Sequence, residues 1–179
     1  MEDLLSATFD SPVGVLTLVA GERGLRAVLW PDEPAARVVL PGTRPLSAAE
    51  NGTRAAQVLA DTMAQLNEYF AGVRHEFDLP LDPVGTPFQL QVWEVLRSIP
   101  CGATITYGEQ AMRLGDRNKS RAVGSANGRN PISIIVPCHR VVGSTGALTG
   151  FAGGLDTKSW LLRHEQGLTT LPVWPPLPV

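Results

Sequence analysis

The stretch IIVPCHRVVG, residues 134–143, decides how the second half of this chain is interpreted. Three β-branched apolar residues stand before a proline, and such a run predicts a buried strand that ends beside Cys138. The cysteine then has two interpretations of about equal weight. It can be a buried core thiol, because free cysteine is among the most buried residue types. It can also be a nucleophile, because the imidazole of His139 and the cation of Arg140 favour a thiolate.

The composition is typical of a soluble globular protein. The 179 residues allow one large domain or two small ones, and 44% hydrophobic with 18% charged residues is enough for a core. The N-terminal segment MEDLLSATFD is acidic and lacks the basic and long apolar regions of a signal peptide. No apolar run approaches the length of a membrane span. We therefore expect a cytoplasmic protein without a membrane partner.

The cysteine and histidine content argues against a disulfide or a metal site. Cys101 and Cys138 are the two cysteines, and a cytosolic chain keeps such thiols reduced. The three histidines, His75, His139 and His164, form no ligand spacing with them. We expect no metal and no other cofactor.

Charge is distributed unevenly along the chain, although the net charge is only −2. Residues 1–84 hold six Lys and Arg against twelve Asp and Glu, whereas residues 85–179 hold nine against five. An acidic half joined to a basic half is what a one-sided polyanion-binding surface would produce. An ordinary solvated surface gives the same counts, so charge alone does not decide.

The first half is expected to form a small α/β domain with an antiparallel sheet. The turn sequences SPVG and GERG separate three short apolar stretches, and glycine supplies the positive φ that tight turns need. The predicted strands lie at residues 4–10, 13–20 and 24–30. A proline-rich loop follows over residues 31–46, in which the apolar piece Val38–Leu40 could add a strand.

A helix is predicted over residues 53–71, where apolar side chains recur at helical spacing. Gly72 ends this helix. We place the domain boundary near residues 83–85, which gives domains 1–84 and 85–179.

The second half opens with strong helix signals. Thr86 is a cap, Pro87 stands at the first helical position, and Gln89 follows three residues after the cap. This helix is expected to run to Ile99 and to stop at Pro100.

Two short helices are expected next. Thr106 and Glu109 form a second capping box, and Gly115 ends the helix that follows. After the polar link 116–119 comes a helix ending at Gly128, which makes a helix-turn-helix pattern. Such a pattern alone is weak evidence, but the link and second helix carry three cations: Arg117, Lys119 and Arg121.

The remaining chain is expected to hold a strand over residues 132–136 and a glycine-rich hairpin or wing over residues 143–154. A closing helix is predicted over residues 157–167, capped by Asp156. The four prolines of the tail exclude a helix there, so it is expected to be extended.

Three stretches carry a close resemblance to a known family. They are IPCGATITYGEQA (99–111), SRAVGSANGRNPISIIVPCHRVVGSTGALTGFAGGL (120–155) and KSWLLRHEQG (158–167). In these residues the chain resembles the O6-alkylguanine-DNA alkyltransferases. The resemblance implies an N-terminal ribonuclease H-like α/β domain and a C-terminal winged helix-turn-helix domain that binds DNA and carries the reaction.

By this resemblance Cys138 is the alkyl acceptor. It would attack the alkyl carbon on guanine O6 and would not be regenerated, so that each molecule reacts once. His139 would act as a general base through a water, Glu165 would orient the histidine, and Asn130 would support the turn before the cysteine. Taken singly, His139 could be a satisfied core histidine and Glu165 a solvated residue at a helix end.

The resemblance also implies contacts with DNA, because a base inside a duplex must be flipped out before it can react. Arg121 would fill the space that the flipped base leaves in the stack, and Tyr107 would push on the target phosphate. The simpler interpretation of Arg121 is a phosphate contact, and that of Tyr107 is an aromatic residue packed on the core. Small residues suit close approach to a narrow minor groove. The implied DNA-contacting set is Arg121, Tyr107, Gly124, Ser125, Ala126 and Arg140.

The implied substrate pocket is formed by Tyr107, Val141, Phe151, Ala152 and Gly153. Many relatives carry Tyr or Ser in this loop, so the size of alkyl group that fits stays open. The first domain here also lacks the cysteines with which some relatives bind zinc.

Other classes of protein account less well for these features. A non-catalytic relative that binds alkylated DNA would lack the cysteine. A winged-helix regulator would need a dimerisation element, and a cysteine hydrolase would turn over. We therefore expect a monomeric DNA-repair alkyltransferase whose partner is double-stranded DNA containing O6-alkylguanine; how cooperatively it binds DNA is left open.

Overall fold

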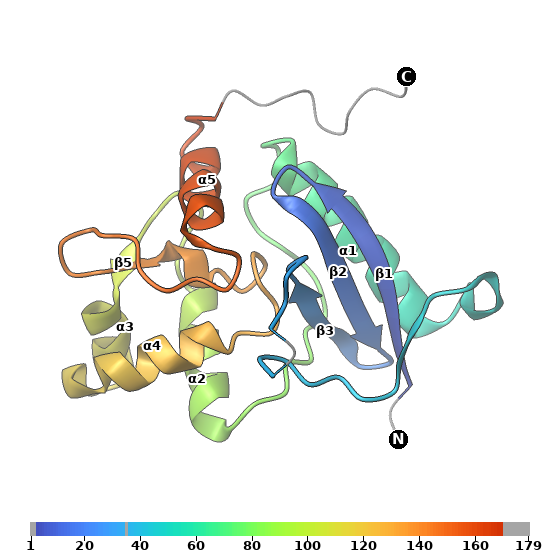
Figure 1. Cartoon of the computed structure of the whole chain (residues 1–179), viewed down its shortest axis with the longest axis horizontal. Coiled ribbons are helices and arrows are strands. Elements are labelled where there is room, and N and C mark those ends of the chain that lie inside the picture. Colours follow the sequence, from blue (N-terminus) through green and yellow to red (C-terminus); the bar gives the residue numbers. More distant parts are fainter. Residues whose placement is uncertain (1–2, 35, 170–179) are drawn as a thin grey trace. The chain divides into compact units, whose positions relative to one another are not determined.

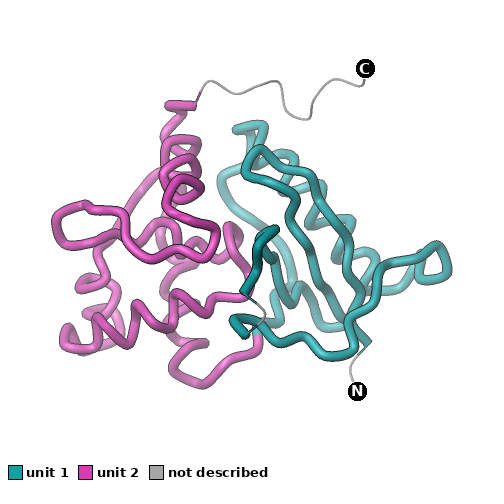
Figure 2. The backbone as a smooth tube through the Cα atoms, viewed as in Figure 1, with its two compact units in different colours: residues 1–83, 170–179 teal, residues 84–169 magenta. Residues whose placement is uncertain are grey.

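The structure is a computed structural model that describes residues 3–34 and 36–169. The chain forms two compact units, the first up to Pro83 and the second spanning Val84–Thr169 (Figure 2). The expected extended tail lies, from residue 170 on, outside the described residues. Within the described part of the chain, no helix is both long and apolar enough to cross a membrane.

Unit 1 is built on a four-stranded sheet with the order β3-β2-β1-β4. Strands β1 (Leu4–Ser11), β2 (Gly14–Gly21) and β3 (Gly24–Leu29) form the predicted antiparallel meander. The fourth strand is β4 (Thr43–Pro45), which pairs in parallel with β1. A proline is compatible with this position because β4 lies at the sheet edge.

The prediction of a further strand at Val38–Leu40 was wrong. Val38 and Leu40 instead pack as loop residues against the buried cluster of Leu4, Val19 and Ala27. Val39, between them, is exposed. The partial burial of Val38 and Leu40 shows that apolar contacts do not require pairing in a sheet.

One helix, α1 (Arg54–Phe70), lies along one face of this sheet (Figure 1). The hydroxyl of Thr53 caps it by accepting a hydrogen bond from the amide of Ala56, and Gly72 follows its end with φ of 75°. The buried face of α1 includes the fully inaccessible Leu59, Leu66 and Phe70, and the Phe70 ring stacks 6.2 Å from that of Phe9. Burial of each such side chain contributes about 1.5–3 kcal/mol to stability.

Unit 2 contains five helical segments and a pair of two-residue strands before its closing helix. Their bounds are α2 (Pro87–Arg97), β5 (Ile105–Thr106), α3 (Tyr107–Arg113), the 3-10 turn η2 (Arg117–Lys119), α4 (Ser120–Gly128), the 3-10 turn η3 (Cys138–Arg140), β6 (Val141–Val142) and α5 (Leu155–Glu165). Segments α3, η2 and α4 form the predicted helix-turn-helix arrangement (Figure 1).

The predicted starts of α2 and α3 are confirmed. Thr86 with Gln89, and Thr106 with Glu109, each form a reciprocal capping box. The prediction that Asp156 caps α5 was wrong, because Gly154 occupies the cap position with φ of 85° and Asp156 lies in the first turn. An acidic residue there still favours the helix through its dipole.

The segment before Cys138 is not the predicted strand. Residues 132–136 form successive tight turns, in which the amide of Val136 donates to Ile132 O at 2.9 Å and that of Ile135 donates to Ser133 O at 2.9 Å. Ile134 adopts φ of 72°, a conformation that costs a residue with a Cβ about 1–2 kcal/mol. The run of Ile and Val therefore indicates a buried segment, as it would in a strand, but it does not indicate an extended backbone.

Polar contacts fix the last turn of α4 inside unit 2. The indole of Trp93 donates to Ala126 O at 2.9 Å. The buried amides of Gln110 and Asn127 bond reciprocally at 3.1 and 2.7 Å, which joins α3 to α4. Because both amides are satisfied, they define the alignment of the two helices.

We predict strong energetic coupling between Gln110 and Asn127. Either Gln110→Leu or Asn127→Leu should lower the free energy of unfolding by about 1–3 kcal/mol, since each removes hydrogen bonds from the buried amide that remains. The double variant should lose less than the sum, with a coupling of about 0.5–3 kcal/mol. Urea unfolding followed by circular dichroism measures this, with the exposed Gln91→Leu as control. Additive losses would contradict the predicted coupling.

Candidate active site

Cys138 is held at the start of η3 by the turns that precede it. Its amide donates to Val136 O at 2.9 Å, and the residue is only 8% exposed. Immediately after η3, β6 pairs in parallel with β5, with Ile105 opposite Val141. This pairing brings the start of α3, and therefore Tyr107, beside the segment that carries the cysteine.

His139 and Glu165 form a buried pair. His139 Nε2 lies 2.7 Å from Glu165 Oε1, and both side chains are inaccessible. An ionised carboxylate only accepts, so Nε2 carries the proton and Nδ1 presents a lone pair. Among the described residues Nδ1 has no hydrogen-bond partner. This nitrogen is therefore available as a base.

The electrostatic surroundings keep His139 neutral and Glu165 charged. Burial lowers the pKa of His139, and the cations of Arg140 and Lys158 act in the same direction against the attraction of Glu165. Burial alone would raise the pKa of Glu165, but the hydrogen bonds from His139 and Arg140 outweigh it and hold that pKa well below its usual range.

Asn130 supports the turns before the cysteine. It is buried, its amide nitrogen donates to Val136 O at 2.8 Å, and its oxygen accepts from the amide of Ile132 at 3.1 Å. The two bonds span the turn that contains Ile134. They hold a backbone conformation that the local sequence disfavours.

Lys158 is a central residue of the site that sequence reasoning missed. Its ammonium is inaccessible and donates to Val141 O at 2.6 Å and to Thr149 O at 2.9 Å. The hydroxyl of Tyr107 donates to the same Thr149 carbonyl at 3.2 Å. The signal was present, because Lys158 falls on the face of α5 that also carries Leu161 and Leu162, where a lone cation is unusual.

Cys138 interacts electrostatically with two of these groups. A charge on the thiol would raise the pKa of Lys158 against the lowering by burial, and it adds to burial in raising the pKa of Tyr107. A thiolate at Cys138 would therefore lie near a buried cation.

The predicted pocket residues lie in two environments. Phe151, Ala152 and Gly153 are partly exposed, and the Phe151 ring presents its edge to the His139 ring at 6.5 Å. Val141 is fully buried, and its carbonyl is occupied by Lys158.

The predicted DNA-contacting residues on α4 do not all lie on its exposed face. Arg121 and Ser125 are exposed on its outer face, and Gly124 lies against the Tyr107 ring, where an added Cβ would be 3.7 Å away. Ala126 is buried at 3% exposure and packs inward, so the structure does not place it on this face.

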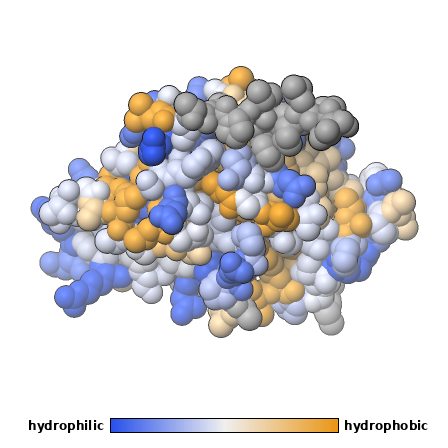
Figure 3. Space-filling model, turned by 45° about the horizontal axis from the view of Figure 1, so that its top comes forward, coloured by the Kyte–Doolittle hydropathy of each residue, from blue (hydrophilic) through white to orange (hydrophobic). Residues whose placement is uncertain are grey.

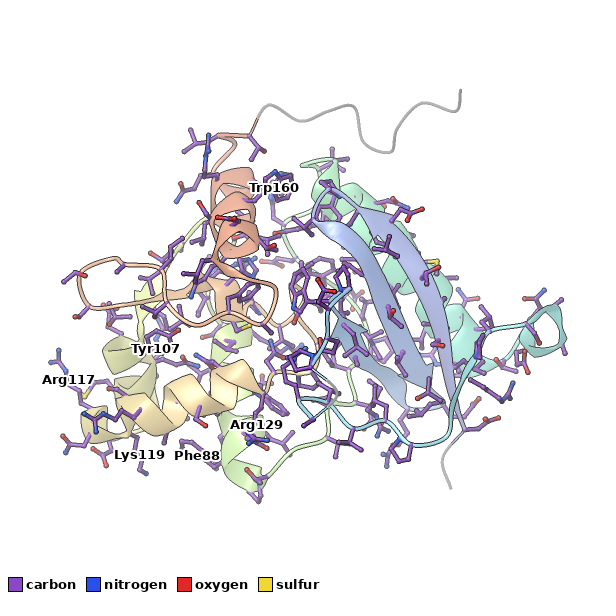
Figure 4. The ribbon with its side chains drawn as sticks, viewed as in Figure 1. Phe88, Tyr107, Arg117, Lys119, Arg129 and Trp160 are labelled. Carbon is purple, nitrogen blue, oxygen red and sulfur yellow. The ribbon has the colours of Figure 1, made fainter. Side chains whose placement is uncertain are left out.

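Cations lie at both ends of α4. Figure 4 shows Arg117 and Lys119 at the η2 end and Arg129 at the opposite end. In Figure 3, hydrophilic side chains gather over the part of unit 2 that carries η2, at the lower left. The outer face of α4 thus has small residues in its middle and cations at its ends.

Arg140 does not belong to this face. It is 6% exposed, and its guanidinium donates to both oxygens of Glu165 at 2.9 and 3.0 Å. These bonds direct its side chain toward Glu165, so the structure does not place Arg140 on the outer face of α4.

Together the fold and the site define a class of protein: a helix-turn-helix protein with a buried thiol beside a neutral histidine that a carboxylate orients. Comparison with known proteins then names the family. Residues 4–83 match the description "6-O-methylguanine DNA methyltransferase, ribonuclease-like domain" and residues 87–167 match "6-O-methylguanine DNA methyltransferase, DNA binding domain".

Curated relatives and a solved structure agree with this. The chain is 46% identical to the methylated-DNA--protein-cysteine methyltransferase of Shigella flexneri, over 90% of this chain and 95% of that protein. It is 44% identical to the protein of that name from Methanosarcina acetivorans, over 89% and 96%. A crystal structure of Mycobacterium tuberculosis OGT in complex with DNA superposes with a TM-score of 0.80 at 41% identity, over 92% and 94%.

The chain belongs to the 6-O-methylguanine DNA methyltransferase family. It is a transferase of DNA repair that moves an alkyl group to a cysteine.

We predict that Lys158→Met loosens the loop over residues 143–154. Without the ammonium, the buried carbonyl of Val141 loses its partner, which costs about 1–3 kcal/mol. The carbonyl of Thr149 keeps only the bond from the Tyr107 hydroxyl. Amide hydrogen exchange should accelerate in this loop. The control is Arg163→Met, an exposed cation of the same helix. Equal exchange in both variants would show that Lys158 does not hold the loop.

Proposed function

We propose that Cys138 is the cysteine that accepts the alkyl group, and that the donor is O6 of an alkylated guanine. The observation that carries this is that the nearly buried Cys138 directly precedes a neutral His139, whose Nδ1 has no hydrogen-bond partner among the described residues. At Cys101, the other thiol, burial and the negative charge of Glu165 both raise the pKa, so its surroundings disfavour a thiolate.

The proposed reaction is one displacement with one proton moved. The thiol proton passes through a water to His139 Nδ1, and the thiolate attacks the alkyl carbon. An S–C bond forms as the O6–C bond breaks, and the electron pair of the broken bond stays on guanine O6. The proton then returns from His139 to the departing guanine, which leaves neutral. The product thioether has no leaving group that water displaces readily, so each molecule reacts once.

We propose that the target base leaves the duplex before this step, because Cys138 is too buried to reach a stacked base. The exposed face of α4 would enter the minor groove, where its small middle permits close approach and the cations at its ends meet phosphates. Arg121 would fill the vacated stack, and Tyr107, beside the thiol and half buried, would contact the flipped base.

The protein is proposed to act as a monomer in the cytoplasm. All residues of the proposed site lie within unit 2 of one chain, so no second copy is needed to complete it. The reaction consumes a free thiol, which a reducing compartment preserves.

The proposal predicts a stoichiometric gain in protein mass. With duplex DNA carrying one O6-methylguanine, intact-protein mass should rise by about one methylene and stop at one equivalent, as a covalent nucleophile requires. Cys138→Ser should show no gain, and the matched Cys101→Ser should react normally. A mass gain that persists in Cys138→Ser would show that another residue accepts the alkyl group. DNA binding without any mass gain would indicate a damage-binding protein.

The role of Arg121 predicts a dependence on the DNA substrate. Arg121→Ala should slow transfer from duplex DNA by about 10-fold or more, since the cost of unstacking, a few kcal/mol, is no longer offset. Transfer from the free base O6-methylguanine should be unchanged. The control is Arg163→Ala, and equal slowing on both substrates would contradict a role in base flipping.

A further inference from the structure

We propose that Arg140 is a positioning residue for the transfer reaction. It holds the Glu165 carboxylate charged and fixed, so that the proton taken from Cys138 stops at His139. This inference deepens the proposed function and rests on it. It also replaces the expectation that Arg140 contacts DNA.

The geometry around Glu165 leaves its carboxylate no unused position. Oε1 accepts from His139 Nε2 at 2.7 Å and from the Arg140 guanidinium at 3.0 Å. Oε2 accepts from Arg140 Nε at 2.9 Å and from the amide of Gly102 at 3.1 Å. Two parallel bonds from one guanidinium fix the carboxylate in its plane, which an ammonium cannot do.

The third side of the guanidinium is also occupied. Arg140 Nη1 donates to the carbonyl of Ile99, at the end of the helix that precedes Gly102. Arg140 therefore connects the turn after α2 to α5. That turn also supplies the Gly102 amide that bonds to Glu165. Because the donors of Arg140 are engaged on backbone and carboxylate, the residue cannot reach a phosphate without breaking a buried ion pair.

A saturated carboxylate is a poor proton acceptor. To protonate, Glu165 would have to give up one of four N–H donors, three of which carry no removable proton at neutral pH. The proton from the thiol therefore stays on His139, and Glu165 stabilises the resulting imidazolium. His139 is therefore a base with a fixed counter-ion, and Glu165 does not accept the proton from it.

After burial, the charge of Arg140 also contributes to the pH at which His139 becomes a base. The groups that act on His139 are Glu165 and Lys158 from α5 and Arg140 from η3, while Cys138 faces Lys158 and Tyr107. On the far side of the ion pair, Cys101 faces both Glu165 and Arg140.

The sign of the pH effect follows from these charges. Burial and both cations lower the pKa of His139. The base must be neutral to react, so the transfer rate should rise as pH increases through that pKa. Removing the Arg140 charge raises the pKa, and the rise should move to higher pH.

The experiment measures the single-turnover transfer rate against pH, together with affinity for unreactive duplex DNA against salt. Arg140→Lys keeps the charge but loses the two parallel bonds. We expect its rate to fall about 10-fold with the pH of the rise unchanged, the size typical of losing an orienting partner. Arg140→Met should shift the rise to higher pH. Neither variant should alter DNA affinity or its salt dependence, and Arg163→Lys is the control.

Three results would overturn the inference. An Arg140→Lys variant that reacts at the wild-type rate would do so, and this holds even if Arg140→Met fails to fold. A folded Arg140→Met variant with the wild-type pH profile would also do so. Weaker DNA binding with the salt slope reduced by about one would identify a phosphate contact instead. Loss of transfer in the wild type is a different result, because it overturns the proposed function and this inference falls with it.

Discussion

The buried carboxylate of Glu165 is the constraint on which the catalytic unit depends. A charge without solvent must be matched by donors. Here the donors come from the turn after α2 and from η3, and they meet the carboxylate at the end of α5, so three segments converge on Glu165. Satisfying Glu165 therefore fixes where these segments meet. Because His139 and Arg140 directly follow Cys138, the same constraint places the thiol.

The turns before Cys138 show what this placement costs locally. The chain does not pass as an extended strand from α4 to η3, and Ile134 takes a left-handed conformation that a β-branched residue avoids. Burial of the Ile134 side chain and the two bonds of Asn130 offset that cost. Unfavourable backbone next to a reactive residue persists only where the surroundings over-determine it, as they do here.

Local signals in the sequence predicted most of the fold, whereas signals that need tertiary context did not. The capping boxes at Thr86 and Thr106 act within four residues, so they could be recognised directly. The apolar run at 132–136 reported burial but not backbone conformation, and the run at 38–40 is only partly buried. The family resemblance suggested the residues of the site, yet the orientation of Arg140 and the burial of Ala126 depend on partners far along the chain.

The arrangement also fits a protein that uses its thiol once. In a hydrolase, the general base acts a second time, when it activates the water that attacks an acyl or similar intermediate. The nucleophile is recovered in each cycle. A thioether offers no comparable bond to break, so the site has only to remove one proton and stabilise one thiolate. A neutral histidine, a saturated carboxylate and a buried lysine satisfy those two needs. Single use therefore follows from the stability of the product thioether, which no step of the proposed reaction cleaves.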